Sequence, residues 1–218
     1  MKIIMVHGKL QSGKDTFFKL AKVNFIDSKI KVKRFSFADA LKRIASEFGW
    51  DGTKIGDGRW FLIDTGQILR GDYILKEICE KYNHNKTLNY QYIIDKSGKK
   101  TTRKSYNIVD LYKTLTNIFT PCKDFWSNIV CCQIMNSNCD YAIITDFRFQ
   151  NEYYTMLKYF ISTDIYKLNI TRNTVISEFV NDTSENDIKG IESYNTIENN
   201  GTIDDYMYKV EDLFNTLH

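Results

Sequence analysis

The sequence predicts an α/β protein built on a parallel sheet that helices cover on both faces. Short apolar runs such as KIIMVHG (2–8) and DYAIITD (140–146) alternate along the chain with segments of helical periodicity. Strands buried on both faces appear as such continuous runs, and their alternation with helices is typical of parallel sheets. Hydrophobic residues make up 43% of the 218 residues, which is enough for a substantial core and suits one domain.

The first part of the chain begins with a strand and a helix on either side of a glycine-rich turn. In that helix Phe17, Leu20 and Ala21 recur at i, i+3 and i+4, the spacing of one helical face. Ser36 and Asp39 are expected to cap the next helix. The expected elements are a strand at 2–8, a helix at 14–25, a strand at 29–37, a helix at 39–50 and a mainly helical segment at 58–82 that breaks at Gly66.

The polar segment at 83–107 is expected to project from the domain. Its stretch NYQYIID alternates between polar and apolar residues and KSGKK follows, which together predict a β-hairpin. Beyond it the pattern of strands and helices resumes, and an apolar stripe from Tyr206 to Leu217 marks the last helix. The expected elements are helices at 124–135, 151–160 and 205–217, and strands at 140–146, 164–170 and 194–201.

Composition argues against several classes of protein. The net charge is only +3 and no run of Lys and Arg is long, so a small anionic ligand is favoured over a long polyanion such as DNA. The five cysteines do not follow the spacing of paired metal ligands, and adjacent Cys131 and Cys132 are interpreted as buried thiols. No leader and no apolar run long enough to cross a bilayer is evident. We therefore expect a reduced, cytoplasmic protein that does not enter a membrane.

The stretch GKLQSGKDT, residues 8–16, is close to the phosphate-binding pattern G-x-x-x-x-G-K-[ST]. Because it joins a predicted strand to a predicted helix, its backbone N–H groups and the helix N-terminus are expected to bind phosphates, and Lys14 adds a mobile charge. A plain glycine turn with a solvated lysine would not explain these offsets. The predicted ATP-binding residues are Lys9, Gln11, Gly13, Lys14, Asp15 and Thr16.

Asp15 stands where the pattern has a hydroxyl, and Thr16 supplies one a residue later. A carboxylate there suits Mg²⁺, which favours hard oxygen ligands. Asp146 follows an apolar strand, the place where a carboxylate orients the metal in phosphate-loop proteins. We therefore predict a Mg²⁺ site formed by Asp15, Thr16 and Asp146. Arg148 lies two residues further on, then Asn151, for which a helix cap is the simpler interpretation.

At this point the chain resembles a known family. The motifs GKLQSGKDT, FSFADALKRIA, RWFLIDTGQILR, DFW, ITDFRFQNE and YNTIENNGTIDD occur in the same order as motifs of the deoxynucleoside monophosphate kinases of tailed bacteriophages. That family is similar to phosphomevalonate and dephospho-coenzyme A kinases. Its loop reads S-G-K-D-T, so Asp15 is a family trait. Two features lie outside the resemblance, namely the segment 83–107 and Gln11, where the family often has a basic residue.

The resemblance implies a nucleoside-monophosphate-kinase type of P-loop domain, a three-layer sandwich with a five-stranded parallel core sheet and a lid at about 171–190. It also implies ATP- and Mg²⁺-dependent phosphorylation of a deoxynucleoside monophosphate. Arginines bind a dianionic phosphate better than lysines do, because they donate in pairs. The implied catalytic residues are Lys14, Arg70, Arg148 and Arg172. The implied acceptor-binding residues are Phe37, Asp39, Lys42, Gln67, Arg70, Trp126, Arg148, Asn151 and Glu152, with Glu178, Ser184 and Glu185 in the lid.

Several alternatives stay open on the sequence alone. Phe37 and Trp126 are also explained by core packing. The acceptor could instead be a modified pyrimidine monophosphate or phosphomevalonate, because all these kinases need the same donor site. A nucleotide-binding module without catalysis is a further alternative, and a nucleic-acid substrate, suggested by KSGKKTTRK, is a weaker one. The excursion at 83–107 could form a homodimer contact, a substrate cover or a partner site.

Overall fold

The computed structural model describes residues 1–81, 87–89, 93–94, 100–101, 105–173, 193 and 195–217. The chain forms two compact units, one made of residues 1–37 and 127–218 and the other of residues 38–126. Whereas the sequence predicts one domain over 1–218, the middle of the chain groups as a unit of its own. None of the helices in the described part of the chain has the length and apolar character needed to span a bilayer.

The first unit contains a five-stranded sheet in which all neighbouring strands are parallel, in the order β2-β7-β1-β8-β9. The central strand β1 pairs with β7 on one side, where Ile3 lies opposite Ala142, and with β8 on the other, where Ile3 lies opposite Ile165. This confirms the predicted fold class. The strands are β1 (Lys2–His7), β2 (Val32–Phe35), β7 (Tyr141–Ile144), β8 (Ile165–Thr171) and β9 (Asn195–Glu198).

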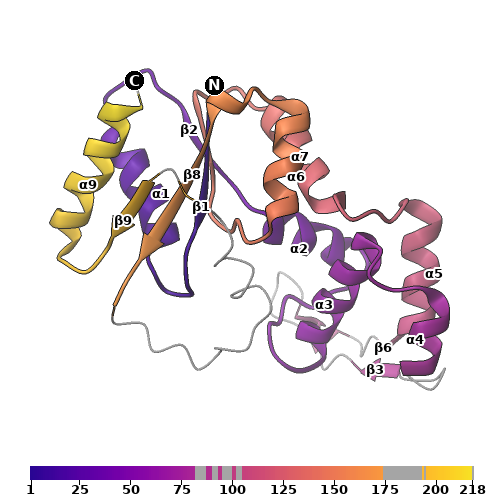
Figure 1. Ribbon diagram of the computed structural model, residues 1–218. Helices are drawn as coiled ribbons and strands as arrows, with labels where there is room; N and C mark the ends of the chain where they lie inside the picture. Colours follow the sequence, from indigo (N-terminus) through magenta and orange to yellow (C-terminus); the bar gives the residue numbers. More distant parts are fainter. Residues whose placement is uncertain are drawn as a thin grey trace. The chain divides into compact units, whose positions relative to one another are not determined.

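Helices cover both faces of this sheet, which makes three layers (Figure 1). Helices α1 (Lys14–Asn24) and α9 (Ile203–Thr216) lie on one face, and α6 (Phe125–Met135) and α7 (Gln150–Tyr159) lie on the other. A short 3₁₀ helix, η1 (Ser162–Asp164), leads into β8. The whole predicted stripe of α9 is buried, as are the predicted residues of α1: Phe17, Leu20, Ala21, Tyr206, Val210, Leu213, Phe214 and Leu217.

The core between the sheet and α1/α9 is closed by aromatic side chains. The Phe214 ring lies 5.0 Å from Phe25 and 5.0 Å from Tyr141, edge to face in both pairs, and stacks 6.1 Å from Phe17. Such geometries add to the free energy gained by burying the rings. The C-terminal helix is therefore packed directly against the helix that follows the glycine-rich loop.

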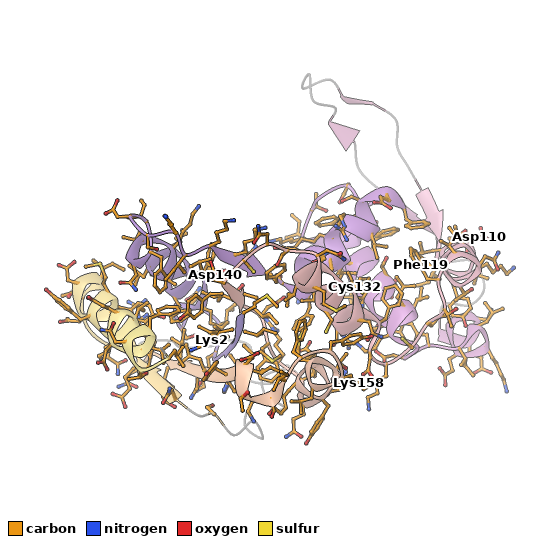
Figure 2. The ribbon with its side chains drawn as sticks, turned by 90° about the horizontal axis from the view of Figure 1, so that it is seen from above. Lys2, Asp110, Phe119, Cys132, Asp140 and Lys158 are labelled. Carbon is orange, nitrogen blue, oxygen red and sulfur yellow. The ribbon has the colours of Figure 1, made fainter. Side chains whose placement is uncertain are left out.

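The amino ends of the strands are joined by backbone and side-chain bonds. The Lys2 amide donates to the Asp140 carbonyl at 2.8 Å, and the Lys31 amide donates to the Asp140 carboxylate at 2.7 Å (Figure 2 labels Lys2 and Asp140). The opposite, carboxyl ends of these parallel strands lead into the loops. In open parallel sheets ligands bind at that edge.

The second unit is mainly helical, with α3 (Gly56–Arg70), α4 (Leu75–Lys81), α5 (Ile108–Ile118) and all but the first residue of α2 (Phe37–Glu47). The region of the predicted hairpin contains antiparallel pairs of short strands, β3 (Thr87–Asn89) with β6 (Ser105–Asn107) and β4 (Ile93–Ile94) with β5 (Lys100–Thr101). Helix α5 was not anticipated, although Ile108, Leu111 and Leu115 recur at the spacing of one helical face and are buried. Its start is capped by Asn107, whose side-chain oxygen accepts from the Val109 amide at 2.8 Å.

Two sequence-based expectations are wrong. Helix α3 is continuous through Gly66, where an added Cβ would make only an ordinary contact with the Leu41 side chain at 3.4 Å. The helix ends instead at Gly71, whose φ is 78°. Cys132 is exposed on α6, so only Cys131 of the adjacent pair is a buried thiol. Cys131 lies 3.4 Å from the Met156 sulfur, and burial raises its pKa to about 12.

Candidate functional site

The glycine-rich loop leaves the central strand and turns through three residues with positive φ: Gly8 at 141°, Gln11 at 61° and Gly13 at 109°. A Cβ on Gly8 would overlap the Ile170 carbonyl oxygen, and one on Gly13 would overlap the Asn199 amide nitrogen. Both positions therefore need glycine for space as well as for conformation. Left-handed residues alternating with right-handed ones form the backbone nests that bind anions.

Lys14 is the first residue of α1 and folds back over this loop. Its Nζ donates to the carbonyl oxygens of Gly8 and Lys9, each at 2.7 Å. The ammonium group is thus held at the mouth of the loop by neutral acceptors. Phosphate oxygens are stronger acceptors for a cation than carbonyls are, so a bound phosphate could take over these bonds.

Two residues from the C-terminal part of the chain hold the loop backbone. The buried Asn199 side chain donates to the Ser12 carbonyl at 2.9 Å, and the Tyr206 hydroxyl donates to the Gly13 carbonyl at 3.2 Å. Neither residue was predicted from the sequence to belong to the site. The motif YNTIENNGTIDD contains both Asn199 and the turn before α9, but it carries no sign that an amide there reaches residue 12.

Asp146 lies just past β7, next to the end of β2. Its Oδ2 accepts from the Ser36 hydroxyl at 2.8 Å, and its Oδ1 accepts from the Phe37 amide, the first of α2, at 3.1 Å. A carboxylate at a helix N-terminus is electrostatically favourable. Ser36, expected only as a helix cap together with Asp39, thus helps to hold a predicted metal ligand.

Arg34 contacts Asp15, a predicted metal ligand, and the residue that precedes Asp146. Its Nη1 donates to Thr145 Oγ1 at 3.0 Å and lies 3.8 Å from Asp15 Oδ1. Since Thr145 immediately precedes Asp146, Asp15 and Asp146 are brought to the same part of the sheet edge. The Asp15 side chain is 80% exposed, so it is open to a ligand despite this ion pair.

The donor set fits a Mg²⁺ ion that a nucleotide also holds. Among the described residues no group of three or more His, Cys, Asp or Glu is arranged to bind a metal by itself. Mg²⁺ is usually bound by one or two carboxylates together with waters and substrate phosphates. The predicted ligands Asp15, Thr16 and Asp146 are two carboxylates and a hydroxyl, which is the kind of donor set that such a partial site requires.

Glu152 organises the turn that carries Arg148. The buried Glu152 carboxylate accepts from the Arg148 amide at 2.8 Å and from the Phe149 amide at 3.0 Å. These bonds shape the backbone between Asp146 and α7, which explains why an acidic residue is buried there. Arg148 and Asn151 are both half-buried at this turn.

Most of the predicted acceptor residues of the second unit have partners within that unit, and Gln67 differs from them. Lys42 Nζ donates to Asp39 at 2.9 Å, and Arg70 lies 3.5 Å from Asp72. The buried Trp126 indole donates to the Gly66 carbonyl at 3.1 Å. The side-chain oxygen of Gln67 is buried without a hydrogen-bond partner in the described part of the chain.

Two predicted features lie at or beyond the limits of the described structure. Arg172 is exposed just after β8. Most of the predicted lid, with Glu178, Ser184 and Glu185, lies outside the described residues.

The other predicted site residues of the first unit differ in burial. Lys9 and Gln11 are exposed on the loop, Thr16 is half-buried on α1, and Phe37 is only 7% exposed.

The site residues of the first unit share one position in the fold. Each follows the carboxyl end of a parallel strand: the loop follows β1, Ser36 follows β2, Asp146 follows β7, Arg172 follows β8 and Asn199 follows β9. No protein-family model matches the chain, and no curated protein matches it either. A functional assignment therefore depends on this geometry and on the chemistry of the residues.

Proposed function

We propose that the protein is an ATP-dependent kinase that converts a deoxynucleoside 5′-monophosphate into the diphosphate. The observation that carries the proposal is the glycine loop at the carboxyl end of the central strand, with Lys14 folded over it and Asp146 beyond the neighbouring strand β7. This combination provides an anion-binding backbone, a mobile cation and a carboxylate for a metal. Phosphoryl transfer needs little more from a protein than such positioning and charge neutralisation.

On the donor side, each residue has a distinct task. The loop amides from Leu10 to Thr16 would bind the ATP phosphates, and Lys14 would exchange its two carbonyl partners for phosphate oxygens. Asp15, Thr16 and Asp146 would hold Mg²⁺, which neutralises charge on the transferring phosphate. Ser36 and the Phe37 amide keep the Asp146 carboxylate oriented while it does so.

On the acceptor side, arginines would bind the monophosphate. Arg148 shares the turn that Asp146 begins, and Glu152 holds the backbone of that turn. Arg172 follows β8 in the same unit and belongs to the proposed set, whereas Arg70 lies in the second unit and stays a prediction from the sequence. The near-complete burial of Phe37 and Trp126 favours packing as their main role, so base contacts are not assigned to these two rings.

The proposal is tested by ADP release. Each common deoxynucleoside monophosphate is supplied as acceptor with ATP and Mg²⁺, together with hydroxymethylated and ribose forms and phosphomevalonate. We expect turnover with at least one deoxy form and none after chelation of Mg²⁺. Lys14→Ala and Arg148→Ala should each lower kcat by about 10²–10³, the cost of one preorganised donor. Lys19→Ala, which removes an exposed lysine from the same helix as Lys14, should have no effect.

Other results would point elsewhere. ATP binding without ADP release from any acceptor would identify a non-catalytic nucleotide-binding module. Turnover with phosphomevalonate alone would support the proposed ATP site but show that the acceptor is not a nucleotide. Unchanged activity of Arg148→Ala with every acceptor would remove that residue from the mechanism.

A further inference from the structure

His7 is a buried polar residue at the end of the central strand, directly before the loop. It is only 2% exposed. Its Nε2 lies 2.7 Å from the Ser193 hydroxyl, and its ring meets Phe147 edge to face with centroids 5.9 Å apart. Buried polar groups are normally hydrogen-bonded because an unsatisfied one costs free energy. The contact with Ser193 therefore supplies the hydrogen bond that the buried Nε2 needs.

The three segments that meet at this imidazole all belong to the candidate site. His7 precedes Gly8, whose carbonyl holds Lys14 Nζ. Phe147 stands between Asp146 and Arg148. Ser193 lies two residues before β9, the strand after which Asn199 binds the loop carbonyl of Ser12. The His7 ring thus contacts the turn after β7, through Phe147, and the residues just before β9, through Ser193. The His7 backbone leads directly into the loop.

The hydrogen-bond partners of the two ring nitrogens favour one tautomer. Nδ1 is buried and has no hydrogen-bond partner in the described part of the chain. Burial, followed by the positive charges of Lys14 and Lys167, lowers the His7 pKa to about 4, so the ring is neutral at pH 7. A proton on Nδ1 would be a buried donor without an acceptor, whereas a proton on Nε2 has the Ser193 oxygen to bond. The geometry therefore favours the tautomer with the proton on Nε2, which donates to Ser193 Oγ.

We propose that His7 is a positioning residue for the phosphate loop: its Nε2–H bond to Ser193 holds the end of β1 and thereby the Gly8 carbonyl that places Lys14. This inference rests on the proposed function, because it assigns His7 an effect on ATP binding. The side chain touches neither nucleotide in this role. It acts through the loop backbone.

Matched substitutions separate the donor at Nε2 from the bulk of the ring. The amide nitrogen of Gln reaches the position of His Nε2, whereas that of Asn reaches only the position of Nδ1. We expect His7→Asn and Ser193→Ala each to weaken binding of Mg²⁺ with a non-hydrolysable ATP analogue by about 3- to 10-fold, the effect of one lost hydrogen bond. His7→Gln should stay within about twofold of the unaltered protein, and the His7→Asn/Ser193→Ala double variant should be no worse than either single variant.

The affinities are measured by calorimetry on the full chain, with thermal unfolding as a check on folding. In parallel, ¹⁵N NMR of the imidazole should show the proton on Nε2 at pH 7. Equal weakening by Gln and Asn, an unaffected Ser193→Ala, or a proton on Nδ1 would overturn the inference. If the unaltered protein binds the analogue and the variants behave as expected but no acceptor is phosphorylated, the kinase assignment fails and the role of His7 stands. If an acceptor is phosphorylated but the variants bind the analogue unchanged, the kinase assignment stands and the role of His7 fails.

Discussion

Asp15 shows how a single residue changes the balance of charge at the loop. A carboxylate beside ATP phosphates is repulsive unless a cation compensates it. Arg34 lies 3.8 Å from Asp15 and also bonds Thr145, so a cation is already present at this position. An exposed ion pair of this kind adds only about 0–1 kcal/mol to stability. Its effect is local, because Arg34 compensates part of the Asp15 charge beside the glycine-rich loop.

His7 should make the protein sensitive to acid. Because the folded state holds its pKa at about 4, below the ordinary 6.5, the unfolded chain binds more protons between these values and stability falls as pH falls. We expect the His7 contribution to cost about 2 kcal/mol between pH 7 and pH 5. Urea unfolding at both pH values checks this. The decline should be shallower by that amount in His7→Gln, and equal declines would contradict the pKa shift.

At the scale of elements, the loop and α1 depend on parts of the chain that follow much later. Gly13 caps α1 in a left-handed conformation, and the carbonyls of Ser12 and Gly13 are held by Asn199 and Tyr206. Without the later part of the chain, the carbonyl of the buried Ser12 would lose the hydrogen bond from the Asn199 side-chain amide. The loop conformation is thus stabilised by the turn after β9 and by α9 as well as by its own glycines.

Gly13→Ala tests this dependence. Alanine at φ 109° costs about 1–2 kcal/mol, and its Cβ would displace the Asn199 amide, adding about 1–3 kcal/mol for the buried carbonyl left unpaired. The matched control is Gly52→Ala, at φ 84° with open space around it, which carries only the first cost. Free energies of unfolding from urea titrations should differ by at least about 1 kcal/mol between the two variants. Similar unfolding free energies for the two variants would mean that the Asn199 side chain can move away from the new Cβ at little cost.

At the scale of the molecule, the parallel sheet brings distant sequence positions to one edge. The order β2-β7-β1-β8-β9 puts the first strand of the chain at the centre, between two strands from its second half. Tyr206 and Phe214 connect α9 to the loop and to α1 respectively. The stability of the N-terminal loop is therefore tied to the C-terminal helix.

Phe214→Ala tests whether the packing of α9 stabilises the protein. The side chain is 1% exposed among other aromatic rings, so its loss should cost about 3–5 kcal/mol of unfolding free energy. Tyr208→Ala, on the same helix but 66% exposed, should change it by no more than about 0.5 kcal/mol. Thermal and urea unfolding measure both. Comparable losses would show that α9 is not packed as described.

The sequence was enough to predict the parallel α/β class, most strands and helices, and the glycine loop with Lys14 and Asp146, because these depend on local periodicity and on residues close together in the chain. It also misplaced the break at Gly66 and the burial of Cys132, since neither periodicity nor composition reports which face a neighbour covers. Only the tertiary structure revealed the roles of Arg34, Ser36, Asn199 and Ser193. Their bonds join residues more than 100 positions apart, and the physical reason is that strand order, which no local pattern encodes, decides which side chains meet at the sheet edge.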